Sequence, residues 1–192
     1  MKATVALLAN TEVHNQVRKL SWDIHQKYRT GIDICRLPPH ISLKQPFDIF
    51  DPGTIEAYMT ELASSVSPFQ INLTHLELIE TTIDGSKTGI LWLNVEETAV
   101  LRQLHNRVNE ELKQRFENVP ADFDGADYHF HMTVSLGGQP IEIYRGILEY
   151  FSNRIKNIQF LVKELVMFIY DDRYSLNAGY MTYRVTPLGG SE

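Results

Sequence analysis

The chain has 192 residues, of which 43% are hydrophobic and 22% are charged, and these proportions are ordinary for a globular protein that buries a core. Its formal net charge of -6 argues against a protein that coats duplex nucleic acid, because such binding needs many Lys and Arg contacts to phosphate. The single cysteine, Cys35, excludes an intramolecular disulfide and a thiolate-rich metal site.

The chain begins with a short apolar run at residues 3–9, directly behind Lys2. This run is at the short end for the hydrophobic region of a signal peptide, and a charged amphipathic segment follows it. We therefore interpret it as a buried first strand. No run in the sequence is long enough to span a bilayer, so we expect a cytoplasmic protein without a membrane partner.

A first helix is predicted after this strand. Asn10 or Thr11 is placed to cap its start, and Gly31 is expected to close it. The Pro-Pro pair at 38–39 then separates the helix from a strand that begins at His40. The apolar residues of the helix recur at helical spacing, at Val13, Val17, Leu20 and Ile24.

A second helix is predicted to start at Asp51 and Pro52, because a capping carboxylate there precedes a proline in the first turn. After this helix, the apolar residues recur first at the spacing of β-strands and then at the spacing of a helix. We predict strands over residues 69–79 and 90–95, joined by a turn region at 84–86, and a third helix from about residue 98 to 116.

The last part of the chain continues this alternation of elements. Residues 117–127 are acidic and interrupted by proline and glycine, which predicts a loop. A strand around His131 follows and ends at a glycine pair, and Pro140 begins a fourth helix. Two final strands are predicted over residues 159–170 and 180–186, linked through 171–179.

The order helix, histidine-bearing strand, helix, strand, strand occurs twice along the chain. This order predicts an internal duplication of architecture without obvious sequence identity. Two α+β lobes, each contributing one histidine-bearing strand, would face each other across a cleft. No Gly/Ser-rich linker separates the halves, so we expect one compact bilobal domain over residues 1–192.

Both histidine-bearing strands contain the pattern His-x-(Ser/Thr) among alternating apolar and polar residues. Residues i and i+2 of a strand point to the same side, so His40 shares a face with Ser42, their side-chain heads roughly 6–7 Å apart. His131 and Thr133 are related in the same way. The two segments read Pro-His-Ile-Ser-Leu-Lys at 39–44 and His-Phe-His-Met-Thr-Val-Ser at 129–135.

The two motifs resemble the signature of the 2H phosphoesterase superfamily, which includes bacterial 2'-5' RNA ligase-like proteins and cyclic nucleotide phosphodiesterases. The segment from Pro39 to Leu43 fits that signature closely, whereas Phe130 stands before the second motif, where proline is common. The order of elements and the spacing of the motifs extend the resemblance over nearly the whole chain. It implies a bilobal α+β fold in which two antiparallel sheets line an active-site cleft.

The resemblance also implies a metal-independent hydrolase without a cofactor, acting on 2',3'-cyclic phosphates of nucleotides or RNA ends, with 2'-5' RNA linkages as a further substrate class. Histidine titrates near neutrality, so one imidazole can accept a proton from water while the other protonates the departing ribose oxygen. His40 and His131 would take these roles, in an order that the sequence leaves open. Ser42 and Thr133 would donate hydrogen bonds to non-bridging phosphate oxygens.

Two neighbours of the motifs are candidate substrate-binding residues. Lys44 continues the face of His40 and would add positive charge near the phosphate, with a solvated lysine at a strand end as the alternative. His129 lies on the same face as His131, and we place it at the rim of the cleft, as a substrate contact or as an inert surface residue. We take His131 as catalytic because Thr133 follows it at the required spacing.

Two other functions fit the same residues. A metal-dependent hydrolase would use His129 and His131 as a ligand pair, with His40 as a third ligand, and a non-catalytic module would bind RNA ends in the cleft. Sensitivity to a chelator separates the first alternative, and turnover of a simple cyclic nucleotide separates the second. The expected partner is a small nucleotide or a single-stranded RNA end rather than an extended duplex, and we expect a monomer.

Overall fold

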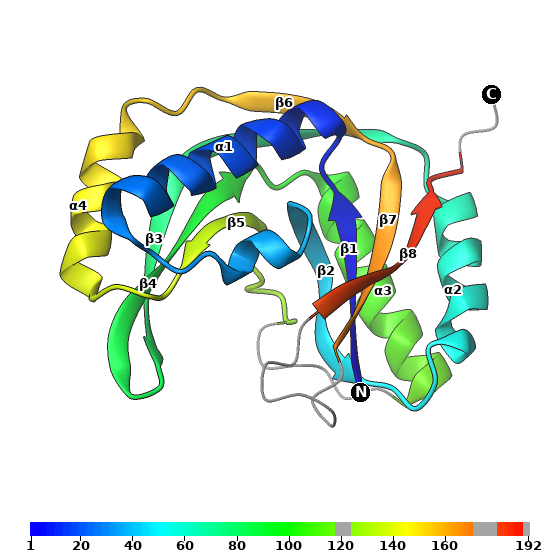
Figure 1. Cartoon of the computed structure of the whole chain (residues 1–192). Coiled ribbons are helices and arrows are strands. Elements are labelled where there is room, and N and C mark those ends of the chain that lie inside the picture. The colour runs from blue at the N-terminus through cyan, green and yellow to red at the C-terminus, as the bar shows by residue number, and fades with distance from the viewer. Residues whose placement is uncertain (118–123, 171–179, 190–192) are drawn as a thin grey trace.

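The computed structural model describes residues 1–117, 124–170 and 180–189. The connection predicted over 171–179 lies outside these residues, as does most of the loop predicted over 117–127. No helix in the described part of the chain has both the length and the apolar character that crossing a bilayer requires. In chain order (Figure 1), the elements are β1 (Lys2–Leu8), α1 (Thr11–Tyr28), the 3-10 helix η1 (Asp33–Arg36), β2 (His40–Asp48), α2 (Gly53–Ser64), β3 (Phe69–Ile83), β4 (Ser86–Val95), α3 (Ala99–Phe116), β5 (His131–Leu136), α4 (Ile141–Ser152), β6 (Ile158–Val162), β7 (Glu164–Tyr170) and β8 (Tyr180–Pro187).

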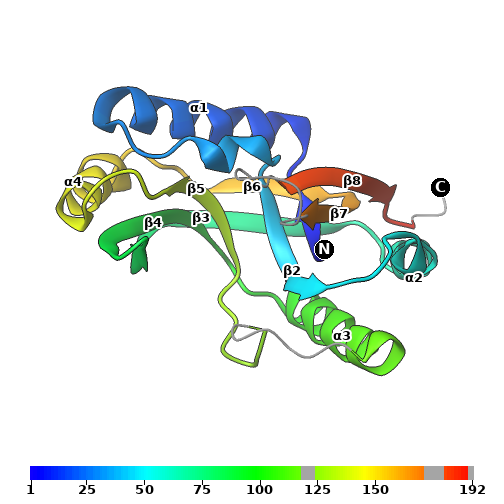
Figure 2. The ribbon, with the colours of Figure 1, turned by 60° about the horizontal axis from the view of Figure 1, so that its bottom comes forward.

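The strands form two four-stranded antiparallel sheets. Sheet A has the order β2-β1-β7-β8, and sheet B has the order β5-β4-β3-β6. Helices α2 and α3 contact strands of sheet A, whereas α1 and α4 contact strands of sheet B. Figure 2 shows α1 and α3 on opposite sides of the layer of strands. This arrangement confirms the predicted bilobal α+β fold with one antiparallel sheet in each lobe.

Two units of the chain, residues 2–83 and 86–170, exchange a strand. β3 comes from the first unit and pairs with β4 of the second, whereas β7 comes from the second unit and pairs with β1 of the first. The duplication therefore consists of two units, β1-α1-β2-α2-β3 and β4-α3-β5-α4-β7, each of which adds its last strand to the other unit's sheet. One cluster of buried hydrophobic side chains includes residues of both sheets, so the lobes share a core.

The prediction of a single strand over residues 159–170 is wrong. β6 ends at Val162 and pairs with β3 in sheet B, and β7 begins at Glu164 and pairs with β1 in sheet A. The chain passes between the sheets at Lys163, whose carbonyl oxygen accepts a hydrogen bond from the Leu188 amide at 2.8 Å. Apolar residues continue on both sides of the break because both strands contribute to the core. The charged pair Lys163 and Glu164 is therefore the local sequence feature that marks the break.

The predicted starts of the first and third helices are confirmed by side-chain caps. The Asn10 side chain accepts a hydrogen bond from the Val13 amide at 2.9 Å, and the Thr98 hydroxyl accepts one from the Leu101 amide at 3.2 Å. Each cap satisfies one of the amides that a helix N-terminus leaves without an intrahelical partner.

Gly31 does not close the first helix, contrary to the prediction. α1 ends at Tyr28, and Arg29 takes the left-handed conformation with a φ of 57°. Gly31 instead lies against the turn between β5 and α4, where its amide donates a hydrogen bond to the Gly137 carbonyl at 2.8 Å. A Cβ on Gly31 would clash with the Leu136 carbonyl oxygen. Glycine is therefore needed here for the close approach of two backbones.

The two motif strands are edge strands of different sheets, and they contact each other (Figure 1). Each strand has a β-bulge directly after its motif hydroxyl. The bulge interrupts the alternation of side chains, so the residue that follows it is buried in both strands. Val5 and Ala6 are neighbours in β1, but their partners in β2 are Lys44 and Ser42, which have one residue between them. In the same way, the neighbours Leu91 and Trp92 of β4 pair with Ser135 and Thr133 of β5.

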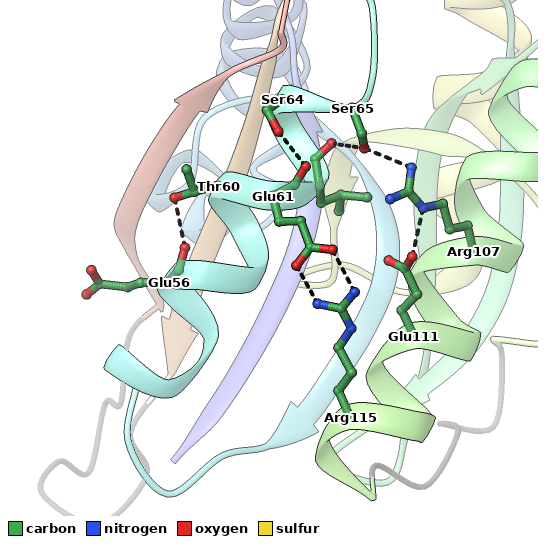
Figure 3. A network of polar contacts seen from close by, with 9 residues as sticks. Glu56, Thr60, Glu61, Ser64, Ser65, Arg107, Glu111 and Arg115 are labelled. Carbon is green, nitrogen blue, oxygen red and sulfur yellow. Dashed lines mark hydrogen bonds and ion pairs between the residues drawn. The ribbon is translucent and has the colours of Figure 1, made fainter.

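A network of polar contacts joins α2 to α3 (Figure 3). Arg115 donates two hydrogen bonds to the Glu61 carboxylate, at 2.6 and 2.7 Å. Arg107 contacts the Ser65 hydroxyl at 2.8 Å and the Glu111 carboxylate at 2.9 Å. Exposed ion pairs of this kind contribute about 0–1 kcal/mol each, so buried apolar contacts dominate the packing of both helices.

Candidate active site

The two motif histidines are the first residues of β2 and β5 and are held in the same way. The His40 Nδ1 lies 2.8 Å from the Pro38 carbonyl oxygen, and the His131 Nδ1 lies 2.8 Å from the His129 carbonyl oxygen. A carbonyl oxygen only accepts hydrogen bonds, so each Nδ1 carries the hydrogen and each Nε2 is left as the proton-transfer atom. Both imidazoles are half-buried.

A pocket brings residues of the two motifs together. Its lining includes His40 from β2 and Thr133 from β5, together with Arg18 from α1 and the segment Leu37 to Pro39 that precedes β2. Gly31 contacts the end of β5, and η1, which lies between Gly31 and this segment, also contacts β5. The pocket therefore lies at the junction of the two edge strands.

The two motif hydroxyls have different surroundings. Thr133 lines the pocket beside His40. The side chain of Ser42 interacts with the Tyr128 phenol, and Gln45 donates a hydrogen bond to that phenol at 3.3 Å. Ser42 is therefore part of a polar network between β2 and the segment that precedes β5.

Arg18 supplies a cation at the pocket that the sequence analysis did not identify. It lies on α1, and its guanidinium donates a hydrogen bond to the Ile34 carbonyl at 3.3 Å. Its position became apparent only from the way α1 and η1 lie beside β5. In the sequence it is one of several polar residues on an amphipathic helix, and no local pattern distinguishes it.

Lys44 does not reach the pocket, so the geometry does not support its interpretation as a substrate-binding residue. Its side chain is 1% exposed and forms an ion pair with Asp124, whose side chain is 0% exposed. The other Asp124 carboxylate oxygen accepts a hydrogen bond from the Gln45 amide at 2.9 Å. The physical reason is the bulge in β2, which turns Lys44 away from the face of His40 and into the interior.

The surroundings of the two imidazoles favour their neutral forms. Burial, together with the charges on His131 and Arg18, lowers the pKa of His40 to about 4, against the opposing effect of the Pro38 carbonyl. Burial also lowers the pKa of His131, and the hydrogen bond to the His129 carbonyl opposes this shift. An anion bound between the rings would raise both pKa values.

His129 is exposed and lies beside His131. Its Nε2 is 2.7 Å from Asn94 Oδ1 and 3.1 Å from a Glu77 carboxylate oxygen. Trp92 stacks on the imidazole of His131, with ring centroids 4.1 Å apart. Trp92 was not predicted from the sequence, because its place opposite Thr133 follows from the pairing of β4 with β5.

No group of three His, Cys, Asp or Glu side chains is arranged to hold a metal ion within residues 1–117, 124–170 and 180–189. The set of His129, His131 and His40, which the alternative of a metal-dependent hydrolase requires, is therefore not gathered in that part of the chain.

Comparison with known sequences identifies relatives over most of the chain. The family description of the 2'-5' RNA ligase superfamily matches residues 10–173. A protein of Geobacillus thermodenitrificans that bears a provisional phosphoesterase name is 31% identical over 119 residues, which are 55% of this chain and 65% of the relative. The match thus spans slightly less than two thirds of that relative's length.

Solved structures share the fold at low sequence identity. TT0787 of Thermus thermophilus has a TM-score of 0.59 at 13% identity, covering 100% of both chains. LigT of E. coli has a TM-score of 0.52 at 13% identity in its phosphate complex and 0.53 at 11% identity in its 3'-AMP complex, covering 98% of both chains in each case. These similarities confirm the bilobal α+β fold.

Proposed function

The chain belongs to the 2'-5' RNA ligase superfamily, and we propose that it is a metal-independent phosphodiesterase that opens 2',3'-cyclic phosphates of nucleotides or RNA ends. The observation that carries the proposal is the pair of half-buried imidazoles on contacting edge strands, each fixed through Nδ1 by a backbone carbonyl. Linkages of the 2'-5' type in RNA are a second substrate class, because their cleavage needs the same two proton transfers.

In the proposed reaction, the neutral imidazole of the pair accepts a proton at Nε2 from a water molecule. The oxygen of that water bonds to phosphorus, and the bond from phosphorus to one ribose oxygen breaks. The departing oxygen takes the proton from Nε2 of the second, protonated imidazole, which leaves a phosphate monoester. General acid and base groups each contribute about 10²–10⁴ to a rate.

The remaining groups at the junction would hold the phosphate. Thr133, which lines the pocket, and Ser42 would donate hydrogen bonds to non-bridging oxygens, and such donors stabilise the charge that develops in the transition state. Arg18 provides a positive charge at the same pocket. We assign His129 to the rim of the site and Lys44 to the interior, where it pairs with Asp124.

Small nucleotide phosphates are the ligands that fit this proposal. The E. coli LigT structures contain phosphate and 3'-AMP, and the formal charge of -6 for this chain is unfavourable for a long phosphate backbone. A nucleoside cyclic phosphate or a single-stranded RNA end needs only a local pocket.

The test is a panel of 2',3'-cyclic nucleotides and 2'-5' dinucleotides, assayed with and without EDTA. We expect turnover of at least one cyclic phosphate and full activity in EDTA. Loss of activity on chelation, restored by zinc or manganese, would instead establish the metal-dependent hydrolase. Binding of these ligands without any turnover would establish the non-catalytic module.

A further inference from the structure

Trp92 links His131 to a carboxylate on a third strand. It lies on β4, opposite Thr133 of β5 on one side and opposite Glu77 of β3 on the other. Its indole stacks on the His131 imidazole, with ring centroids 4.1 Å apart and planes inclined by 23°. Its Nε1 donates a hydrogen bond to a Glu77 carboxylate oxygen at 2.8 Å. Glu77 thus anchors the ring that covers His131.

The same carboxylate oxygen also holds His129. The His129 Nε2 lies 3.1 Å from it, and the His129 ring stacks on Trp92 with centroids 5.5 Å apart. The backbone carbonyl of His129 is the group that accepts the hydrogen bond from the His131 Nδ1. Glu77 therefore contacts the Trp92 ring, which stacks on His131, and the side chain of His129, whose backbone carbonyl fixes the Nδ1 of His131.

The other motif histidine has a different environment. The ring of His40 lies on Phe168 at an inclination of 60°, with centroids 4.7 Å apart, and Arg18 lines the same pocket. A nearby cation disfavours a charged imidazole, whereas a nearby carboxylate favours it. The face of an indole adds an attraction for a cation that is stronger than that of a benzene ring.

We propose that Glu77, acting through Trp92 and His129, positions His131 and favours its protonated form, so that the two motif histidines differ in proton affinity. The charges support this direction, because Glu77 raises the pKa of His131 against the effect of burial. Arg18 and His131 both lower the pKa of His40. Other titratable groups near His131 are His40, His129, which lowers its pKa, and Tyr128, whose ring centroid is 6.2 Å away.

The first test is an NMR titration of the histidine ring protons in the free protein. Glu77→Gln keeps an acceptor for the Trp92 indole but removes the charge, so we expect the pKa of His131 to fall while that of His40 changes little. The matched control is Glu80→Gln, which removes a carboxylate of the same strand that pairs with the exposed Arg145. A His131 pKa that is the same in both variants would overturn the proposal.

The second test separates positioning from substrate contact. Trp92→Phe keeps an aromatic ring against His131 but removes the hydrogen bond to Glu77, and a loosened imidazole costs up to about 10²-fold in kcat. The effect on turnover rests on the proposed function, and we expect a lower kcat with little change in KM. A raised KM with an unchanged kcat would show that Trp92 contacts substrate instead. If no substrate were turned over, the titration would still decide the proposal.

Discussion

His40 and His131 are oriented by the same short-range contact, a hydrogen bond from Nδ1 to the backbone carbonyl of the residue two positions earlier. This contact fixes both the tautomer and the direction of the ring. It is made to the backbone, so the hydrogen bond itself requires no particular side chain at position 38 or 129. The consequence is that Nε2 of each histidine is the nitrogen left for proton transfer, with a backbone carbonyl rather than a carboxylate at Nδ1.

Substitution of these histidines tests their roles. His40→Ala and His131→Ala should each lower kcat by about 10²–10⁴, the usual range for the loss of a general acid or base. His129→Ala should cost much less, because its Nε2 is already engaged by Asn94 and Glu77. Steady-state kinetics on a 2',3'-cyclic nucleotide measure this, with circular dichroism to show that the variants fold. If His129→Ala were the most damaging change, His129 rather than His131 would be the acid–base group.

The two motif hydroxyls should differ in importance. Thr133→Ala removes a hydrogen bond to a charged phosphate oxygen, worth about 1.5–3 kcal/mol, or roughly a 10- to 150-fold loss in kcat/KM. Ser42→Ala should lie at the lower end of that range, because the Ser42 side chain already interacts with Tyr128 and is not among the residues that line the pocket. Unchanged kcat/KM and unchanged phosphate affinity in both variants would show that neither hydroxyl faces the substrate.

The bulge in β2 determines what Lys44 does. It places the ammonium against Asp124 in the interior, and loss of one partner of a buried ion pair leaves an uncompensated charge. Lys44→Met should therefore lower the free energy of unfolding by about 3–5 kcal/mol, measured by urea denaturation. The added substitution Asp124→Asn should recover part of this loss. A raised KM with unchanged stability in Lys44→Met would instead identify Lys44 as a substrate ligand.

The close approach of Gly31 to the end of β5 can be tested in the same way. Gly31→Ala introduces a Cβ that clashes with the Leu136 carbonyl oxygen, and the resulting backbone shift should cost about 1–3 kcal/mol of stability. Activity should fall as well, because the displaced segment lines the pocket. Gly146→Ala in α4 is the matched control, since a Cβ there meets nothing within 4 Å and alanine favours a helix. Equal effects of the two substitutions would contradict the account of Gly31.

Elements with strong local signals could be predicted from the sequence. The candidate cap Asn10 and the apolar periodicity located the helices, and alternation located both motif strands. The bulges could not be predicted, because they insert a residue without any change in composition. Lys44 was therefore placed on the face of His40, where strict alternation would have put it. The break at Lys163 was missed for a similar reason, since apolar residues continue on both sides of it.

Contacts between distant segments explain the rest of what the sequence did not reveal. Arg18 and Trp92 belong to the candidate site only because α1 lies beside β5 and because β4 pairs with β5. Both depend on the arrangement of whole elements, and a single sequence records no such pairing. The resemblance to the 2H phosphoesterases predicted the lobes and the cleft but not which neighbours surround each histidine.

At the scale of the whole molecule, the strand exchange determines how the two histidines meet. Each motif strand is the edge of its own sheet, and each sheet contains a strand from the other of the two units. The lobes are thus joined through shared sheets and a shared core, rather than through a hinge alone. This arrangement brings β2 and β5 into contact, although their motifs are separated by about half of the chain.

The central claim is that one imidazole acts as a base and the other as an acid, and the pH dependence of kcat/KM in EDTA tests it most directly. Because the surroundings lower the pKa of both histidines in the free protein, one neutral and one charged ring coexist only on the acidic side of neutrality. We therefore predict a bell-shaped profile of kcat/KM with its maximum below about pH 7, and a maximum of kcat at higher pH, since bound phosphate raises both pKa values. A profile that rises with pH and never falls would contradict the two-histidine mechanism.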